Sequence, residues 1–273
     1  MPGPDAEVEE RAALADLAAT AARRAGAMLL EGERSKRTAV STKSSPTDMV
    51  SEMDRASEAA IRSLITSERP DDAILGEEGG QASGSTRVRW IVDPLDGTTN
   101  YLYGFPAWSV SVAAECDGAV AAGAVYDPIH DELFKAVDGA GATRNGETLH
   151  VGDRQPSDLS TALIATGFAY GADRRAVQAR WVAHVLPRVR DIRRAGSAAL
   201  DLCWVAAGRL DGYYEQGTQI WDWAAGALIA TEAGAIVGGF DGGPPSSDGL
   251  LAATPELAGP LRVLLAEAGA LAQ

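Results

Sequence analysis

The run of residues 90–100, which reads WIVDPLDGTTN, constrains the fold of this chain more than any other stretch. Its apolar start predicts a buried strand, and Pro94 stiffens the turn that carries Asp93 and Asp96. The residues from Gly97 onward predict the start of a helix. Carboxylates bind hard cations, and the free N–H groups at a helix start donate to phosphate oxygens. This run can therefore hold a cation beside a phosphate group.

A simpler interpretation of the same run is an Asp-rich turn that only caps a helix. Four further segments argue against it, because each carries an acidic residue near a predicted strand end or on a predicted helix. Taken alone, each acid has an ordinary explanation, such as a surface acid for Asp54 or a helix N-cap for Asp222. The four segments are 43–54, 73–80, 196–215 and 220–226.

The order of the predicted elements indicates both α and β structure in one chain. Apolar residues at helical spacing predict helices over 6–31 and 48–67, joined by a polar segment up to Pro46. Short strands from 108 to 151, with an Asn-Gly turn at 145–146, predict an antiparallel meander. The later alternation of strands and helices is typical of an α/β layer. We predict strands at 73–77, 88–93, 109–114, 119–126, 132–137, 162–166, 189–193, 210–215, 235–238 and 250–253, and helices at 173–186, 197–207, 221–233 and from 255 onward.

The charge of the chain limits its partners. It has 38 Asp and Glu against 24 Lys and Arg, a net charge of −14, which argues against nucleic-acid binding through a broad basic face. The two cysteines, Cys116 and Cys203, have no metal-ligand spacing and imply no disulfide framework. No stretch reaches the roughly 18 apolar residues of a membrane span, and the acidic N-terminus is unlike a signal peptide. We expect a cytoplasmic protein with no membrane or nucleic-acid partner.

Taken together, these segments resemble the inositol monophosphatase family of Mg²⁺-dependent, Li⁺-sensitive phosphatases. The motifs appear in the family's order from residue 43 to residue 234, and 192–203 is especially similar to bacterial inositol-1-monophosphatases. The resemblance implies an α+β fold, a layered α-β-α-β-α sandwich that forms one catalytic unit and commonly a homodimer. Its N-terminal half, 1–153, would carry the meander and most metal ligands, and its C-terminal half, 154–273, the substrate-pocket residues.

The resemblance also assigns metal ligands. Glu77, Asp93 and the main-chain carbonyl of Leu95 match the holders of a first Mg²⁺ ion. Asp93, Asp96 and Asp222 match the holders of a second, and a third, weaker ion would lie near Glu77. All of these donors are oxygen atoms, so Mg²⁺, or Mn²⁺ as a substitute, is favoured over Zn²⁺.

The remaining assignments concern the reaction and the substrate. Asp54 and Thr98 match the pair that orients the attacking water, which the metal activates, and Glu77 belongs with them as a catalytic residue. The N–H groups of Gly97 and Thr98 would bind the phosphate. The residues that match substrate contacts are Asp96, Gly97, Thr98, Ala198, Glu215 and Asp222; for Glu215, an exposed acid after a strand is the structural alternative.

We therefore expect hydrolysis of inositol 1-phosphate, and related polyol monophosphates, to inositol and phosphate. Three same-fold alternatives for the substrate stay open: histidinol phosphate, fructose 1,6-bisphosphate and 3′-phosphoadenosine 5′-phosphate. A bisphosphate needs extra cationic contacts, which Arg174, Arg175, Arg193 and Arg194 could supply. An acid at position 215 suits a neutral polyol better than a second phosphate. A regulatory protein that acts through partners is an alternative of another class. It is disfavoured because Asp54, Thr98 and the ligand acids are all present.

Overall fold

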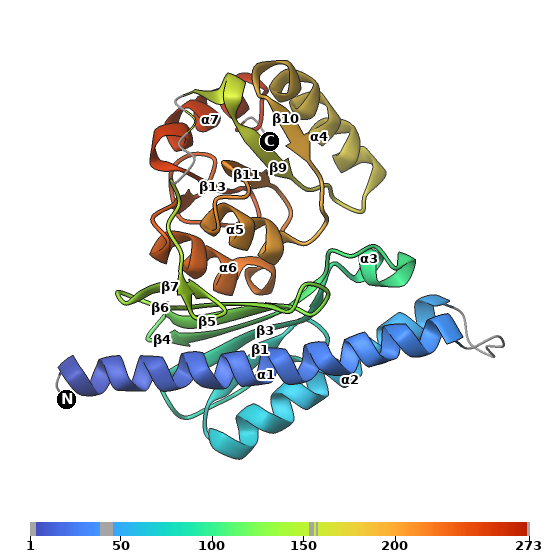
Figure 1. Ribbon diagram of the computed structural model, residues 1–273, viewed down its shortest axis with the longest axis vertical. Coiled ribbons are helices and arrows are strands. Elements are labelled where there is room, and N and C mark those ends of the chain that lie inside the picture. Colours follow the sequence, from blue (N-terminus) through green and yellow to red (C-terminus); the bar gives the residue numbers. More distant parts are fainter. Residues whose placement is uncertain (1–3, 39–45, 153–155, 157, 272–273) are drawn as a thin grey trace.

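The computed structural model describes residues 4–38, 46–152, 156 and 158–271, and the structural statements below concern these residues. The Lys43 end of the first acidic segment lies outside them. Helices and sheets form five layers (Figure 1). This arrangement confirms the predicted α-β-α-β-α sandwich. From one face to the other, the layers are α1 (Pro4–Thr38) with α2 (Pro46–Glu68), an eight-stranded sheet, α5 (Ala198–Ala206) with α6 (Ile220–Glu232), a five-stranded sheet, and α4 (Ala172–Val185) with α7 (Pro255–Glu267).

The first sheet has the strand order β2-β1-β3-β4-β5-β6-β7-β8, and only β1 and β3 pair in parallel. The strands from β3 to β8 form the predicted antiparallel meander. Asn145 and Gly146 have φ values of 51° and 86°, as the two-residue hairpin turn requires. The exposed strand β2 was not predicted. The bounds are β1 (Ala73–Gly76), β2 (Gly80–Ala82), β3 (Val88–Asp96), β4 (Ser109–Cys116), β5 (Ala119–Asp127), β6 (Glu132–Val137), β7 (Gly141–Arg144) and β8 (Glu147–Thr148).

Strand β3 corrects one sequence prediction. It does not end at Asp93 but continues to Asp96, and its pairing with β4 shifts register between these two residues. Pro94 lies in the shift, where its missing N–H removes nothing from the ladder. The acidic turn is therefore a bulge within the strand, and both carboxylates lie at its end. Helix α3 (Thr98–Tyr103) follows as predicted.

The second sheet has the order β10-β9-β11-β13-β12. Its three parallel strands, β10, β9 and β11, end on the same side of the sheet. Such carboxyl ends commonly form binding crevices in sheets of this kind. The bounds are β9 (Leu163–Thr166), β10 (Asp191–Arg193), β11 (Gly212–Glu215), β12 (Ile236–Gly238) and β13 (Leu250–Ala253).

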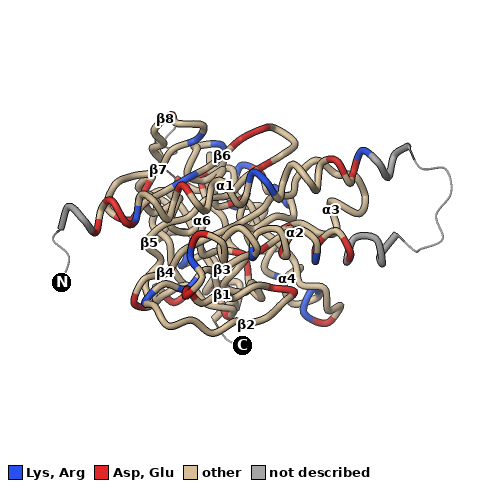
Figure 2. Tube along the Cα trace, turned by 90° about the horizontal axis from the view of Figure 1, so that it is seen from below, with Lys and Arg blue, Asp and Glu red and all other residues tan. Residues whose placement is uncertain are grey.

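Helix α1 corrects a second prediction. The expected end at residue 31 is wrong, because the helix continues to Thr38 through part of the polar segment. Glu33 in this part is 6% exposed. Among the described residues, no helix combines the length and the apolar character that crossing a membrane requires. On the side of α1 and α2, basic residues are interspersed with acidic ones (Figure 2), and two ion pairs, Arg11–Asp138 and Lys135–Asp16, join α1 to the sheet.

Small residues bring the middle helix layer close to the first sheet. The first six residues of β4 are all buried, because helices cover both faces of the sheet. A Cβ atom added at Gly123 of β5 would lie 3.0 Å from Cα of Ala225 in α6. A second close approach places Gly226 of α6 against Leu202 of α5. Helix α6, which carries Asp222, is thus held tightly against the sheet that carries Asp93.

Candidate active site

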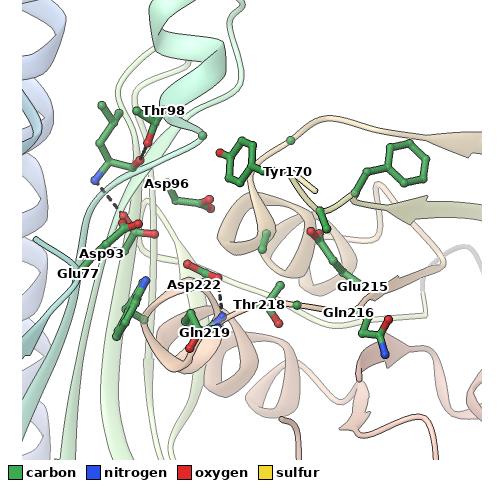
Figure 3. Close-up of a pocket in the computed structure, with 18 of the residues that line it drawn as sticks. Glu77, Asp93, Asp96, Thr98, Tyr170, Glu215, Gln216, Thr218, Gln219 and Asp222 are labelled. Carbon is green, nitrogen blue, oxygen red and sulfur yellow. Dashed lines mark hydrogen bonds between the residues drawn. The ribbon is translucent and has the colours of Figure 1, made fainter. Parts of the chain in front are cut away.

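The two sheets and the helices between them enclose a cavity of about 320 Å³. It is lined by the ends of β1 and β3, the starts of α3, α5 and α6, and the end of β11 (Figure 3). Five acidic side chains from both halves of the sequence meet there. The structure places in the lining every predicted metal and substrate residue, namely Glu77, Asp93, Leu95, Asp96, Gly97, Thr98, Ala198, Glu215 and Asp222.

The acids of β3 are held by hydrogen bonds within the fold. Asp93 accepts one from the main-chain N–H of Leu95 at 3.0 Å. Asp96 accepts two, from the Ser197 hydroxyl at 2.6 Å and from the N–H of Ala199 at 2.8 Å. Asp96 therefore caps the start of α5, so a carboxylate of the first half of the sequence is bonded to a helix of the second half.

The sequence left open whether Asp222 caps a helix or faces the site, and in the structure it does both. It is the third residue of α6 and accepts a hydrogen bond from the N–H of Gln219, the N-cap residue, at 2.6 Å. It also faces the cavity across from Asp96 (Figure 3). The helix start thus fixes the backbone position of this acid.

Asp54 differs from its sequence interpretation as a surface acid, because it is only 4% exposed. Its Oδ1 atom has no hydrogen-bond partner among the described residues. Burial, with Glu78 and Glu58 nearby, raises the pKa of Asp54 to about 7. It is not a lining residue of the cavity. The Thr98 hydroxyl, its predicted partner, donates to the carbonyl of Leu95 at 3.0 Å.

The acids of the site raise one another's pKa values. Burial, followed by the charges of neighbouring acids, raises the pKa of Glu77, Asp96 and Asp222 to about 7. For Asp93, burial and the charges of Asp96 and Glu77 raise the pKa well above its ordinary value. So many buried carboxylates are costly unless a cation neutralises them.

The donor set fits a hard divalent cation, because every side-chain donor, on Glu77, Asp93, Asp96 and Asp222, is a carboxylate oxygen that lines one cavity. As placed, no three His, Cys, Asp or Glu side chains of the described residues are arranged to hold an ion. Several of their oxygens accept hydrogen bonds from the protein instead. Holding an ion therefore requires these carboxylates to exchange hydrogen bonds for the ion.

The raised pKa values predict how pH affects the metal-free protein. Between about pH 4 and about pH 7, the folded state binds more protons than the unfolded state at Asp54, Glu77, Asp96 and Asp222. Stability in excess chelator should therefore fall as pH rises through this window. Melting temperatures measured across it, with EDTA and with Mg²⁺, test this. Saturating Mg²⁺ should flatten or reverse the trend, since the ion binds ionised carboxylates; the same slope with and without Mg²⁺ would contradict it.

Sequence reasoning missed several lining residues. Phe168 and Tyr170 follow the carboxyl end of β9, and Tyr170 is 84% exposed at the mouth. Arg194, which follows β10, was not missed, because the sequence offered it as one of four arginines that could contact a second phosphate; it lines the cavity, and its guanidinium lies 5.9 Å from the centre of the Phe168 ring. Their position after parallel strands is a signal that the rule for sheet crevices could have used. Ser197, which bonds Asp96, had no signal beyond its place before Ala198.

Comparisons with known proteins agree with this fold. The model of the inositol monophosphatase family matches residues 10–270. A Mycobacterium leprae protein named inositol-1-monophosphatase is 47% identical over 250 residues, 86% of this chain and 84% of that protein. A Pasteurella multocida protein named Nus factor SuhB is 43% identical over 246 residues, 89% and 91% of the two chains. The solved structure of Mycobacterium tuberculosis SuhB has a TM-score of 0.82 and 41% identity, and the match covers 95% of this chain and 98% of that one.

A fold of two mixed sheets and three helix layers, with acids gathered between the sheets, thus defines a phosphatase-type scaffold. The chain belongs to the inositol monophosphatase family. This conclusion confirms the resemblance seen in the sequence.

Proposed function

We propose that this protein is a Mg²⁺-dependent phosphomonoesterase that hydrolyses inositol 1-phosphate and related polyol monophosphates. The observation that carries the proposal is the cavity in which five acids from both halves of the sequence face Thr98 and the start of α3. An acidic protein attracts an anionic substrate to such a site only if cations reverse the local charge. Family membership supports the reaction class.

Four side chains and one carbonyl would hold the ions: Glu77, Asp93, Asp96, Asp222 and the carbonyl of Leu95. When bound, Mg²⁺, or Mn²⁺ in its place, supplies positive charge to the phosphoryl oxygens and makes a water molecule more acidic. The first turn of α3 has no side-chain cap, and its N-cap residue Gly97 has a φ of 92°. Its N–H groups are therefore free to donate to the phosphate.

The water that attacks phosphorus would be oriented by Thr98. A hydroxyl accepts two hydrogen bonds and donates one, so Thr98 accepts from the water while it donates to another group. In this mechanism the Thr98 hydroxyl no longer donates to the Leu95 carbonyl but donates to Asp54. The Oδ1 atom of Asp54 has no partner among the described residues. Because the pKa of Asp54 is raised to about 7 by burial, this carboxylate is basic enough to accept a proton near neutral pH.

Glu215 would recognise the alcohol part of the substrate. It ends β11, lines the cavity and accepts a hydrogen bond from the Tyr213 hydroxyl at 2.8 Å. Burial raises its pKa to about 7. When ionised, the carboxylate accepts hydrogen bonds from neighbouring hydroxyls of a polyol and repels a second phosphate.

Replacing Glu215 by glutamine should lower kcat/KM for inositol 1-phosphate by about 10-fold or more, since hydrogen bonds to charged groups contribute roughly 1.5–3 kcal/mol. An aryl phosphate has no hydroxyl for Glu215 to bind, so its hydrolysis should hardly change. Steady-state kinetics on the two substrates check this. A Tyr213→Phe variant is the matched control, because it removes only the hydrogen bond that the Tyr213 hydroxyl donates to Glu215. Equal losses on both substrates would mean that Glu215 is structural.

Phosphate release from a panel of substrates, with and without Mg²⁺, tests the proposal as a whole. We expect inositol 1-phosphate to be hydrolysed faster than histidinol phosphate, fructose 1,6-bisphosphate or 3′-phosphoadenosine 5′-phosphate. A preference for either bisphosphate would overturn the role of Glu215. We also expect a homodimer, which sedimentation analysis checks.

A second candidate function is favoured by the names of some relatives, which are called Nus factor SuhB. We propose it only as a role in addition to catalysis. A protein that acted through partners alone would have no need of the acids and Thr98 that line the cavity. A variant without phosphatase activity that still supports a cellular role would separate the two functions.

A further inference from the structure

One face of α2 contacts both turns that carry the acids of the site. Asp54 lies three residues before Ser57 and four before Glu58, and Glu58 lies four before Arg62, so they share this face. The Ser57 hydroxyl donates to the carbonyl of Pro94, in the bulge of β3, at 2.8 Å. Glu58 and Arg62 contact the other turn, which follows β1 and begins with Glu77.

Glu58 is a buried acid, 2% exposed, that lies outside the cavity lining. Its carboxylate accepts hydrogen bonds from the N–H groups of Glu78 at 2.8 Å and Gly79 at 2.9 Å. Arg62 donates to the same carboxylate at 2.5 Å and to the carbonyl of Gly80 at 2.5 Å. Glu58 and Arg62 thus bond to each other, and their other described hydrogen bonds are all to the backbone of the turn after Glu77.

The glycines of this turn show how tightly it is seated. A Cβ atom added at Gly76 would lie 2.3 Å from an oxygen of Glu58, and one at Gly79 would lie 2.5 Å from the same oxygen. Gly79 does not have a positive φ, so a side chain there is excluded by the carboxylate and not by the backbone. The turn therefore rests directly on Glu58.

We propose that Glu58, paired with Arg62, is a positioning residue that sets the affinity of the site for Mg²⁺; this inference rests on the proposed function. Glu58 holds the turn that presents Glu77, and its own helix presents Asp54 one turn away. The Glu77 and Asp54 carboxylates are close enough for the charge of Asp54 to act on Glu77. Without Glu58, the turn loses the acceptor for two N–H groups, and Glu77 moves relative to the other ligands.

The test is calorimetric titration of Mg²⁺ into the metal-free protein and its variants. Glu58→Gln keeps the size of the side chain but removes the charge that pairs with Arg62. Gly79→Ala keeps the Glu58 side chain but displaces its carboxylate from the turn. This variant therefore tests the contact between Glu58 and the turn by a second route. The matched control is Asp72→Asn. Asp72 is also a buried acid, and it accepts a hydrogen bond from Arg69 at 2.8 Å. It lies before β1 and does not line the cavity.

Loss of an outer residue that orients a metal ligand typically weakens metal binding about 10–100-fold. We expect losses of this size in Glu58→Gln and Gly79→Ala, with kcat largely recovered at saturating Mg²⁺, and an unchanged Mg²⁺ affinity in Asp72→Asn. Wild-type affinity in a folded Glu58→Gln or Gly79→Ala protein would overturn the inference while leaving the proposed function in place. An equal loss in Asp72→Asn would overturn it as well, by showing a general effect of destabilisation. If wild-type protein binds no Mg²⁺, the proposed function itself fails.

Discussion

Replacement of Asp93 by asparagine is expected to lower kcat/KM for inositol 1-phosphate by about 10³-fold or more, because the charge stabilisation that a metal ion supplies is worth several kcal/mol and each 1.36 kcal/mol is a factor of ten. Asp93 is the acid that the family pattern shares between two ions, so no other single acid should matter as much. Phosphate release at increasing Mg²⁺ measures the loss.

The same variant should be more stable than the wild type when both are metal-free. Burial, and after it the charges of Asp96, Glu77 and Asp222, raises the pKa of Asp93, and asparagine removes the cost of a buried carboxylate while keeping the shape. Activity and metal-free melting temperature should thus change in opposite directions. Asp201→Asn is the control: Asp201 is buried, neither of its oxygens has a partner among the described residues, and it does not line the cavity. This control should also raise the melting temperature but keep its activity and its dependence on Mg²⁺. A fully active Asp93→Asn protein, or wild-type activity in excess EDTA, would refute the metal mechanism.

Replacement of Thr98 by alanine should lower kcat by about 10²–10⁴-fold, the usual contribution of general acid–base catalysis. The substrate should still bind with a similar KM, because the backbone of α3 and the ions hold the phosphate, not the hydroxyl. Steady-state kinetics of the variant separate these two constants.

Two further variants make this experiment specific. Thr98→Ser restores the hydroxyl and should recover most of the rate. Thr99→Ala removes the exposed neighbouring hydroxyl and should have little effect. A raised KM with an unchanged kcat in Thr98→Ala would show that Thr98 binds substrate and does not orient the water.

The fold was largely predictable because its local signals agree with its layers. The Asn145-Gly146 turn can form only a tight hairpin, and the alternation after Pro156 is typical of an α/β layer. The errors occurred where tertiary contacts override local signals. The bulge at Pro94 extends β3 because β4 pairs with Asp96 again beyond it. The polar residues after 31 stay helical through Thr38, although their composition predicts a loop.

That the candidate site residues meet in one cavity was predictable, but their supporting contacts were not. Glu77, Asp93 and Asp222 stand next to strand ends and helix starts, which sequence patterns mark well. The burial of Asp54 depends on how α2 packs against the first sheet, and no local pattern encodes that. The Ser197 hydroxyl donates to Asp96 across 101 positions of the sequence, and the N–H of Glu78, in the turn after Glu77, donates to Glu58 across 20 positions. Nothing in a single sequence pairs such residues.

The contact between β5 and α6 determines how far apart two of the acids can be. Gly123 allows α6 to come so near that a single methyl group would reach 3.0 Å from Cα of Ala225. Asp222 lies about one turn earlier on the same helix, and Asp93 lies on the same sheet as Gly123. We expect a larger residue at position 123 to push the helix outward, by a few tenths of an ångström for alanine, and to carry Asp222 away from Asp93. The spacing of these two carboxylates therefore depends on the apolar interior, on a residue that has no side chain.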